Sequence, residues 1–196
     1  MMNQDALKNL ALETIQSPRT AAQKIMSMNL SRDVLWSGLV LVACLNSIIT
    51  GLSLLLGDAS VLPTLLRNPV LFFAIFAGIQ VLSVHAFYWT GLAIGGKGDL
   101  GDVLALLVWL QVLQLVAQGI LFFLVFVSPG LTEILAMGVS VFALWITVNF
   151  LTEALNFPSL LHAVGAMVLA AVGIAFGLMI LVGLIGLGAM GVPANV

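Results

Sequence analysis

Charged side chains are scarce in this chain. The 196 residues include six Lys or Arg and eight Asp or Glu, so that only 7% of the residues are charged. Soluble domains carry about a quarter charged residues, so an ordinary soluble domain is excluded. The net charge of −2 offers no basic surface for nucleic acid, which requires many phosphate-neutralising cations. Hydrophobic residues make up 62% of the chain and the mean hydropathy is +1.22, which is typical of a membrane protein.

Cysteine and histidine are also nearly absent. Cys44 is the single cysteine, so the chain cannot close an internal disulfide or build a thiolate metal cluster. The two histidines, His85 and His162, lie far apart and form no HExxH metal pair. No serine–histidine–aspartate set stands out. The sequence therefore predicts a protein that is not an enzyme and that binds no metal or other cofactor.

The first 33 residues mix polar and apolar side chains and do not resemble a cleavable signal peptide, which would begin with a short apolar core after a basic start. Helical spacing of Leu7, Leu10 and Thr14 predicts a weakly amphipathic helix at residues 4–16. Ser17 and Pro18 favour the start of a second short helix. This helix can lie in the headgroup region or pack under the membrane helices, and the sequence leaves both arrangements open.

Five apolar runs follow, each about the 20 residues that a helix needs to cross a bilayer. They lie at residues 34–56, 70–94, 103–127, 134–155 and 163–187. Their length and their lack of alternating polarity indicate helices. We therefore expect an all-α membrane protein with amphipathic helices in residues 1–33, a five-span domain at 34–188 and a short external tail at 189–196. A four-span arrangement with one re-entrant run is the main alternative.

Lysine and arginine indicate the orientation, because they concentrate in cytoplasmic segments. With five spans, only Arg67 falls on one side of the membrane, and the other basic residues share the opposite side: Lys8, Arg19, Lys24, Arg32 and Lys97. The N-terminus is therefore expected in the cytoplasm and the C-terminus outside.

Several polar side chains lie inside the predicted spans, where they are costly and usually turn inward or mark a path. The candidate cluster contains Gln80, His85, Gln111, Gln114, Gln118, Asn149 and Glu153. The simpler interpretation is hydrogen bonding between helices. The alternative is a polar cavity for a small substrate or a proton.

A glycine-dense turn, residues 91–102, separates the second and third spans. Gly91, Gly96 and Lys97 approach the spacing of a phosphate-binding loop, but Gly98 replaces the required serine or threonine and the preceding segment is an apolar helix. Nucleotide binding is therefore rejected. The pattern favours a tight turn in which Asp99 or Asp102 caps the next helix.

The tract YWTGLAIGGKGD, residues 88–99, resembles the characteristic motif of the Yip-domain membrane proteins, whose eukaryotic members are Rab-GTPase-interacting factors. Ser17-Pro18-Arg19, Leu144-Trp145 and the turn at residues 156–162 also fit, so that the resemblance extends from about Ser17 to Leu187. It implies five spans, a cytoplasmic N-terminus and an external C-terminus. Eukaryotic members have a long N-terminal region, whereas about 33 residues precede the first span in this chain. This difference puts a Rab-binding role in doubt. It suggests a bacterial-type member in the cytoplasmic (inner) membrane.

The leading function hypothesis is a non-enzymatic interaction or membrane-organising protein. Its candidate interaction loop consists of Gly95, Gly96, Lys97, Gly98 and Asp99. The expected partners are the lipid bilayer and either another membrane protein or a second copy of the chain. The alternative is a small transporter or permeation subunit that uses the polar faces of the second to fourth spans.

Overall fold

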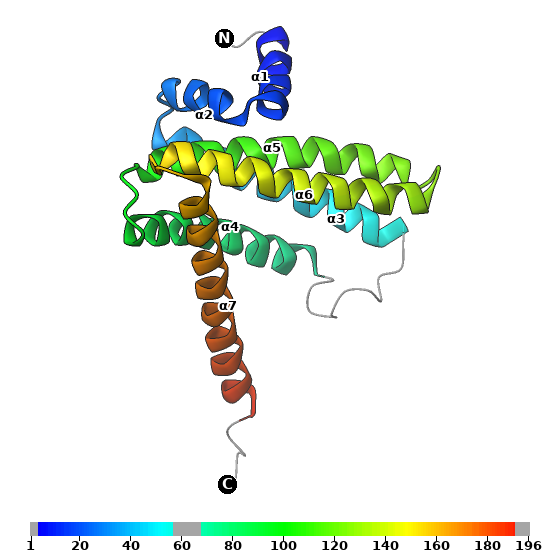
Figure 1. The fold of residues 1–196 in the computed structure, drawn as a ribbon. Coiled ribbons are helices and arrows are strands. Elements are labelled where there is room, and N and C mark those ends of the chain that lie inside the picture. The colour runs from blue at the N-terminus through cyan, green and yellow to red at the C-terminus, as the bar shows by residue number, and fades with distance from the viewer. Residues whose placement is uncertain (1–3, 57–67, 191–196) are drawn as a thin grey trace.

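The computed structural model describes residues 4–56 and 68–190, and over these residues the chain forms seven helices and no strand (Figure 1). The helices are α1 (Gln4–Gln16), α2 (Pro18–Ser27), α3 (Arg32–Leu56), α4 (Pro69–Ala93), α5 (Leu100–Leu124), α6 (Pro129–Ala154) and α7 (Leu160–Met190). Arg67 and residues 191–196 of the expected external tail lie outside the described residues.

Polar residues in the turns set where helices begin. The Asn68 side chain accepts hydrogen bonds from the amides of Val70 and Leu71 at the start of α4. Asp99 accepts from the amide of Gly101 at the start of α5, as expected for a cap. These side chains accept hydrogen bonds from amides that have no partner within the helix. They therefore fix where α4 and α5 begin.

The long helices α3, α5 and α6 run side by side, and α4 lies along α3 and α5 (Figure 1). Large apolar side chains fill the space between them. Leu39 from α3, Leu104 and Leu106 from α5, and Phe150 and Leu151 from α6 are each at most 1% exposed. The packed core therefore lies near the ends of the bundle where α5 begins and α6 ends.

Helix α7 crosses α4 steeply and projects away from the bundle (Figure 1). Small side chains allow this close approach, since Ala163, Ala166 and Ala170 are fully buried. The Thr90 hydroxyl of α4 also lies 3.1 Å from the Ala166 carbonyl oxygen, to which it donates.

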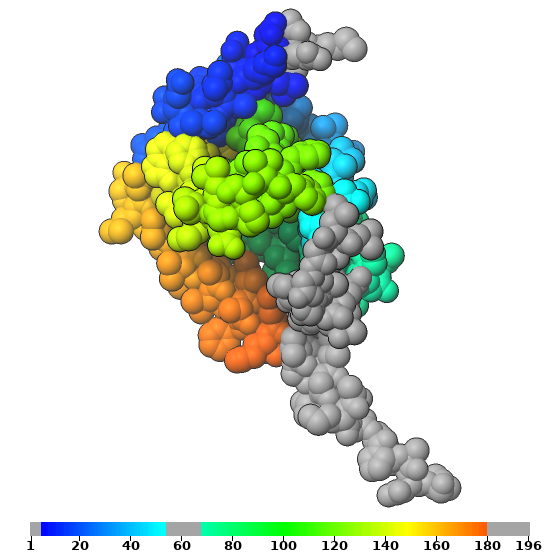
Figure 2. Space-filling view, turned by 90° about the vertical axis from the view of Figure 1, so that its right-hand side faces the viewer, coloured from blue at the N-terminus to red at the C-terminus, as the bar shows by residue number. Residues whose placement is uncertain are grey.

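The two N-terminal helices lie on the side of the α5–α6 hairpin opposite to α7 (Figure 2). Helix α2 packs against α5 and α6, with Ala21 and Ala22 completely buried. Of the two arrangements that the sequence left open, the structure therefore shows direct packing of α2 on the long helices.

Within the described residues, five helices are long and apolar enough to cross a membrane: α3, α4, α5, α6 and the first part of α7. The predicted architecture of five membrane helices preceded by two short helices is confirmed.

Candidate interaction site around the glycine loop

The glycine loop, residues 95–99, is shaped by the end of α4. Gly95 has φ of +101°, a left-handed conformation that favours glycine. The chain then turns back, and the amide of Gly96 donates to the carbonyl of Gly91 at 2.9 Å. A side chain at Gly96 would press against that same carbonyl and against the Phe157 ring. Two adjacent glycines are thus required by the turn itself.

The next residues of the loop dock on the connection between α6 and α7. The Lys97 amide donates to the carbonyl of Leu155 at 2.8 Å. A Cβ on Gly98 would overlap the carbonyl oxygen of Ala154, so that only glycine permits this approach of two backbones. Most of the motif therefore has a packing role, while the side chains of Lys97 and Asp99 remain exposed.

A polar pocket opens beside this loop. It has a volume of about 300 Å³ and lies where the α2–α3 connection meets the start of α5. Charged groups from both segments line it, and Arg32 Nη2 lies 3.6 Å from Asp99 Oδ1. The other lining residues are Ile25, Met26, Asn29, Leu30, Leu35, Gly101, Asp102 and Ala105. The pocket thus joins the N-terminal segment to the glycine loop in one surface.

Helix α2 is fastened to the end of α6 by polar contacts. The Arg19 Nε group donates to Asn149 Oδ1 at 3.3 Å and lies 3.7 Å from Glu153 Oε1. Gln23 donates to the second oxygen of Glu153 at 3.0 Å. The Glu153 side chain is 20% exposed, so this carboxylate has partial access to water while it holds α2 in place.

Helix α1 is tied to α2 and to α5. Lys24 pairs with Glu13 at 3.1 Å. The indole N–H of Trp109 donates to the Thr14 hydroxyl at 2.9 Å, and this hydroxyl in turn donates to the Leu10 carbonyl. These contacts order the N-terminal segment against the bundle.

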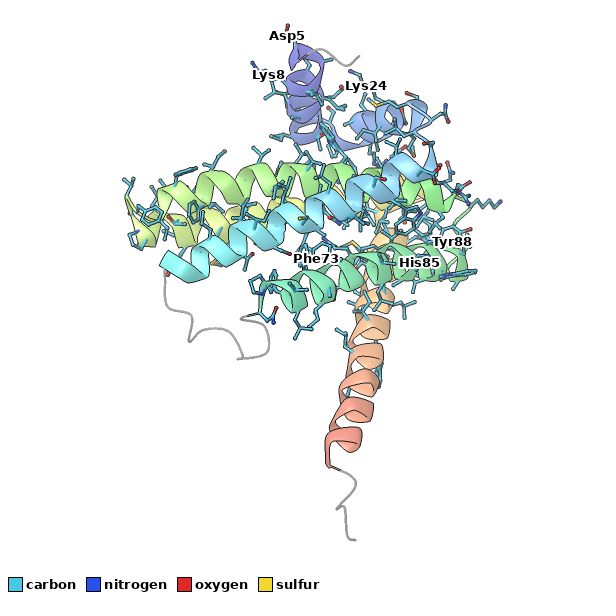
Figure 3. All side chains as sticks on the ribbon, turned by 180° about the vertical axis from the view of Figure 1, so that it is seen from behind. Asp5, Lys8, Lys24, Phe73, His85 and Tyr88 are labelled. Carbon is cyan, nitrogen blue, oxygen red and sulfur yellow. The ribbon has the colours of Figure 1, made fainter. Side chains whose placement is uncertain are left out.

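The remaining polar residues predicted inside the spans do not form one hydrogen-bonded cluster with Asn149 and Glu153. On α4, the His85 ring stacks on Trp36, and its Nδ1–H donates to the Val81 carbonyl oxygen at 2.8 Å, because a carbonyl oxygen can only accept a hydrogen bond. Figure 3 labels His85 and Tyr88 on this helix. On α5, Gln111 is buried, whereas Gln114 is exposed. Among the described residues, no hydrogen bond joins Gln80, His85, Gln111, Gln114 or Gln118 to another member of the set.

The sequence does not indicate the long-range pairings that assemble this surface. The partnership of Arg19 with Asn149 and Glu153 spans the length of the chain, and neither periodicity nor spacing indicates it. Asn29, with φ of +44° in the turn before α3, is likewise a pocket residue that only the tertiary structure identifies. The helical alignment of Thr14 with Leu7 and Leu10 was the one available signal for the contact with Trp109.

Among residues 5–53 and 68–179, whose side chains the structure describes, no group of three or more His, Cys, Asp or Glu side chains is arranged to hold a metal ion.

The helical architecture with five apolar spans defines a multi-pass integral membrane protein. The sequence model of the Yip1 domain matches residues 12–190, which is most of the chain, and the protein belongs to the Yip1 domain family. The resemblance inferred from the glycine motif is thereby confirmed. Comparisons with curated proteins and with solved structures give no match.

Proposed function

We propose that this Yip1-family protein is a non-enzymatic interaction or organising protein of a bacterial cytoplasmic membrane. In this proposal residues 1–33 and the glycine loop face the cytoplasm, residues 34–188 form the membrane domain, and residues 189–196 form an external tail. The partner is another membrane protein or a second copy of the chain.

The observation that carries the proposal is the joint surface of the N-terminal segment and the glycine loop. Arg32 and Asn29 come from the first and Asp99 from the second, and they line one polar pocket. Two N-terminal helices held in place by Arg19, Gln23 and Trp109 present an ordered platform beside it. An ordered surface loses little conformational entropy when it binds a partner.

Charge asymmetry supports the orientation. Of the basic residues that the structure describes, Arg19, Lys24, Arg32 and Lys97 gather at the end of the bundle where α2 ends and α3 and α5 begin, and Lys8 lies on the adjoining α1. Figure 3 shows Lys8 and Lys24 on the two short helices, outside the bundle of long helices. Such an excess is typical of the cytoplasmic side.

The proposal is tested by replacing Lys97 with Glu. Its side chain is exposed while its main-chain amide anchors the loop, so the substitution reverses a surface charge and leaves the backbone contact with Leu155 in place. Proteins captured with the chain from its own membrane after in-cell cross-linking are compared by mass spectrometry. The expected result is loss of at least one partner that the unmodified chain captures at a fixed ratio.

Glu133→Lys is the matched control, since Glu133 is an exposed charge near the start of α6, at the opposite end of the bundle. This variant should retain the full set of partners. An unchanged set in Lys97→Glu, or equal losses in both variants, contradicts the proposed surface.

A second candidate function, a small transporter or permeation subunit, is favoured by one observation. The Gln111 side-chain oxygen is buried and has no hydrogen-bond partner among the described residues. An unpaired amide oxygen inside a helix bundle is costly, and a polar substrate that donates to it would offset that cost. Replacing Gln111, Gln114 and Gln118 by leucine separates the two functions. Loss of a measured flux with folding intact supports transport, whereas unchanged flux with equal or higher thermal stability contradicts it.

A further inference from the structure

An apolar groove of about 560 Å³ lies between α5 and α6 and ends at α1. Among the described residues that line it, Gln114 alone has a polar side chain. The apolar residues of its lining include Ala11 and Ile15 of α1, Leu110 and Ile120 of α5, and Gly138 and Val139 of α6. Both long walls belong to helices that can cross the membrane, so the groove opens toward lipid hydrocarbon.

Helix α1 covers one end of this groove. It stands out from the α5–α6 hairpin instead of running along it (Figure 1). Leu10 is buried against the bundle, and Thr14 accepts the hydrogen bond of Trp109 on α5. Ala11 and Ile15, on the neighbouring part of the same helix, face the groove. The end of the groove is thus fixed by a specific contact.

The charges of α1 indicate its depth in the membrane. Asp5, Lys8 and Glu13 make hydrocarbon an unfavourable environment for this helix, which belongs at the level of the lipid headgroups. The α5 wall of the groove runs from Leu110 to Ile120. Ten helical residues rise about 15 Å, which equals about half of the hydrocarbon thickness of a bilayer, or one leaflet.

Lys8 supplies a positive charge one helical turn from Ala11, at the covered end of the groove. It shares one face of α1 with Ala11 and Ile15, because residues three and seven positions apart align on a helix. Its side chain is exposed. Among the described residues, Arg19, Lys24 and Arg32 form ion pairs with carboxylates, whereas Lys8 and Lys97 form none, and of these two only Lys8 lies on the helix that covers the groove.

We propose that the groove holds one acyl chain of an anionic phospholipid whose headgroup phosphate is bound by Lys8. The chain runs along Leu113, Val116 and Ile120 of α5 and Val139 of α6. Gln114, exposed at the wall, donates its amide N–H to an ester carbonyl of the same lipid. The length of the groove, its apolar walls and the charge at its covered end each match a part of such a lipid.

The test uses the full chain in phosphatidylcholine vesicles that contain a small fraction of phosphatidylglycerol with a photoreactive diazirine in one acyl chain. After irradiation, labelled peptides are mapped by mass spectrometry. Labelling is expected to concentrate on residues 113–120 and 135–142, above the level on the exposed face of α7. A phosphatidylcholine probe with the same acyl chain should label these peptides less.

Gly138→Phe blocks the groove, since a side chain at Gly138 meets open space and the helix itself is not disturbed. Gly119→Phe is the matched control, because Gly119 of α5 is equally unobstructed and does not line the groove. We expect Gly138→Phe to reduce labelling of the walls to the α7 level and Gly119→Phe to leave it unchanged. Lys8→Gln should reduce the preference for the anionic probe by about fivefold.

Equal labelling in Gly138→Phe and the unmodified chain overturns the groove assignment. Equal labelling by the two probes overturns the role of Lys8. Cross-linking of a cysteine placed at Gly138, in a Cys44→Ala chain, to a second copy of the protein assigns the groove to a protein partner and also overturns the proposal.

Discussion

The Lys97 main-chain amide donates to the Leu155 carbonyl at 2.8 Å and thereby joins the glycine loop to the connection between α6 and α7. Leu155 is fully buried, and its side chain also occupies the space in front of Gly91 at the end of α4. Gly91 is therefore required because the Leu155 side chain fills the space in front of it, whereas Gly98 is required because two stretches of backbone meet there. The charged side chains of the loop, Lys97 and Asp99, are left available at the surface.

Gly98→Ala is expected to destabilise the protein by about 1–3 kcal/mol, because the added methyl group overlaps the Ala154 carbonyl oxygen and the loop has to move. Thermal unfolding in mild detergent measures the change. Gly119→Ala, where the methyl group meets open space within α5, should be neutral or stabilising by up to about 1 kcal/mol. A Gly98→Ala protein as stable as the unmodified chain would contradict the close docking of the loop.

Arg19→Ala should loosen α2 from α6, because Arg19 contacts both Asn149 and Glu153. Its side chain is 47% exposed, so water screens the pair and we expect a loss of no more than about 1 kcal/mol. Hydrogen exchange of the α2 amides reports this local opening. In a double-mutant cycle with Glu153→Gln, the two effects should be non-additive, and additive effects would show that the pair makes no net contribution.

The proposed orientation predicts opposite labelling of two cysteines. In a Cys44→Ala chain, Lys97→Cys should react with a membrane-impermeant thiol reagent only after the cytoplasmic side is exposed. Glu133→Cys, near the start of α6, should react from outside in intact cells. Both native side chains are exposed in the structure, which makes the positions accessible. Labelling of both cysteines from the same side would favour the arrangement with one re-entrant run.

Helix α7 projects steeply, and a Cβ added at Gly173 or Gly177 would lie more than 4 Å from any atom of the other described segments. Glycines four positions apart allow close approach of a second helix in a membrane. If the chain associates with a second copy through this face, the pair Gly173→Leu and Gly177→Leu should reduce the assembly size measured by native mass spectrometry. Folding should be retained because the added side chains meet open space. An unchanged assembly size would dismiss this face as the contact between copies.

The sequence predicts an all-α membrane protein because the bilayer constrains each apolar segment separately. Each long apolar run satisfies its own backbone hydrogen bonds only as a helix, so span number follows from hydropathy. The cap at Asp99 and the turn at the glycine motif are local as well, since they depend on residues a few positions apart.

The candidate site could not be predicted from local sequence patterns, because the side chains that contact one another in it are far apart in the chain. Asn149 and Glu153 were predicted as polar residues within a span, and the structure shows them holding Arg19 of α2. The sequence places Gln111 and Gln114 in one candidate polar cluster, yet Gln111 is buried while Gln114 is exposed and lines the apolar groove.

Hydrophobicity and backbone hydrogen bonding, which act within a segment, thus determined seven helices and a membrane location from the sequence alone. Only the tertiary structure decided that α2 lies against α6, that α7 crosses α4 steeply and that α1 covers a groove. The physical reason is that helix contacts in a membrane depend on the shape of small residues and on a few polar pairs. The hydrogen bond from Thr90 to the Ala166 carbonyl and the ion pair of Arg19 with Glu153 form only when the helices pack.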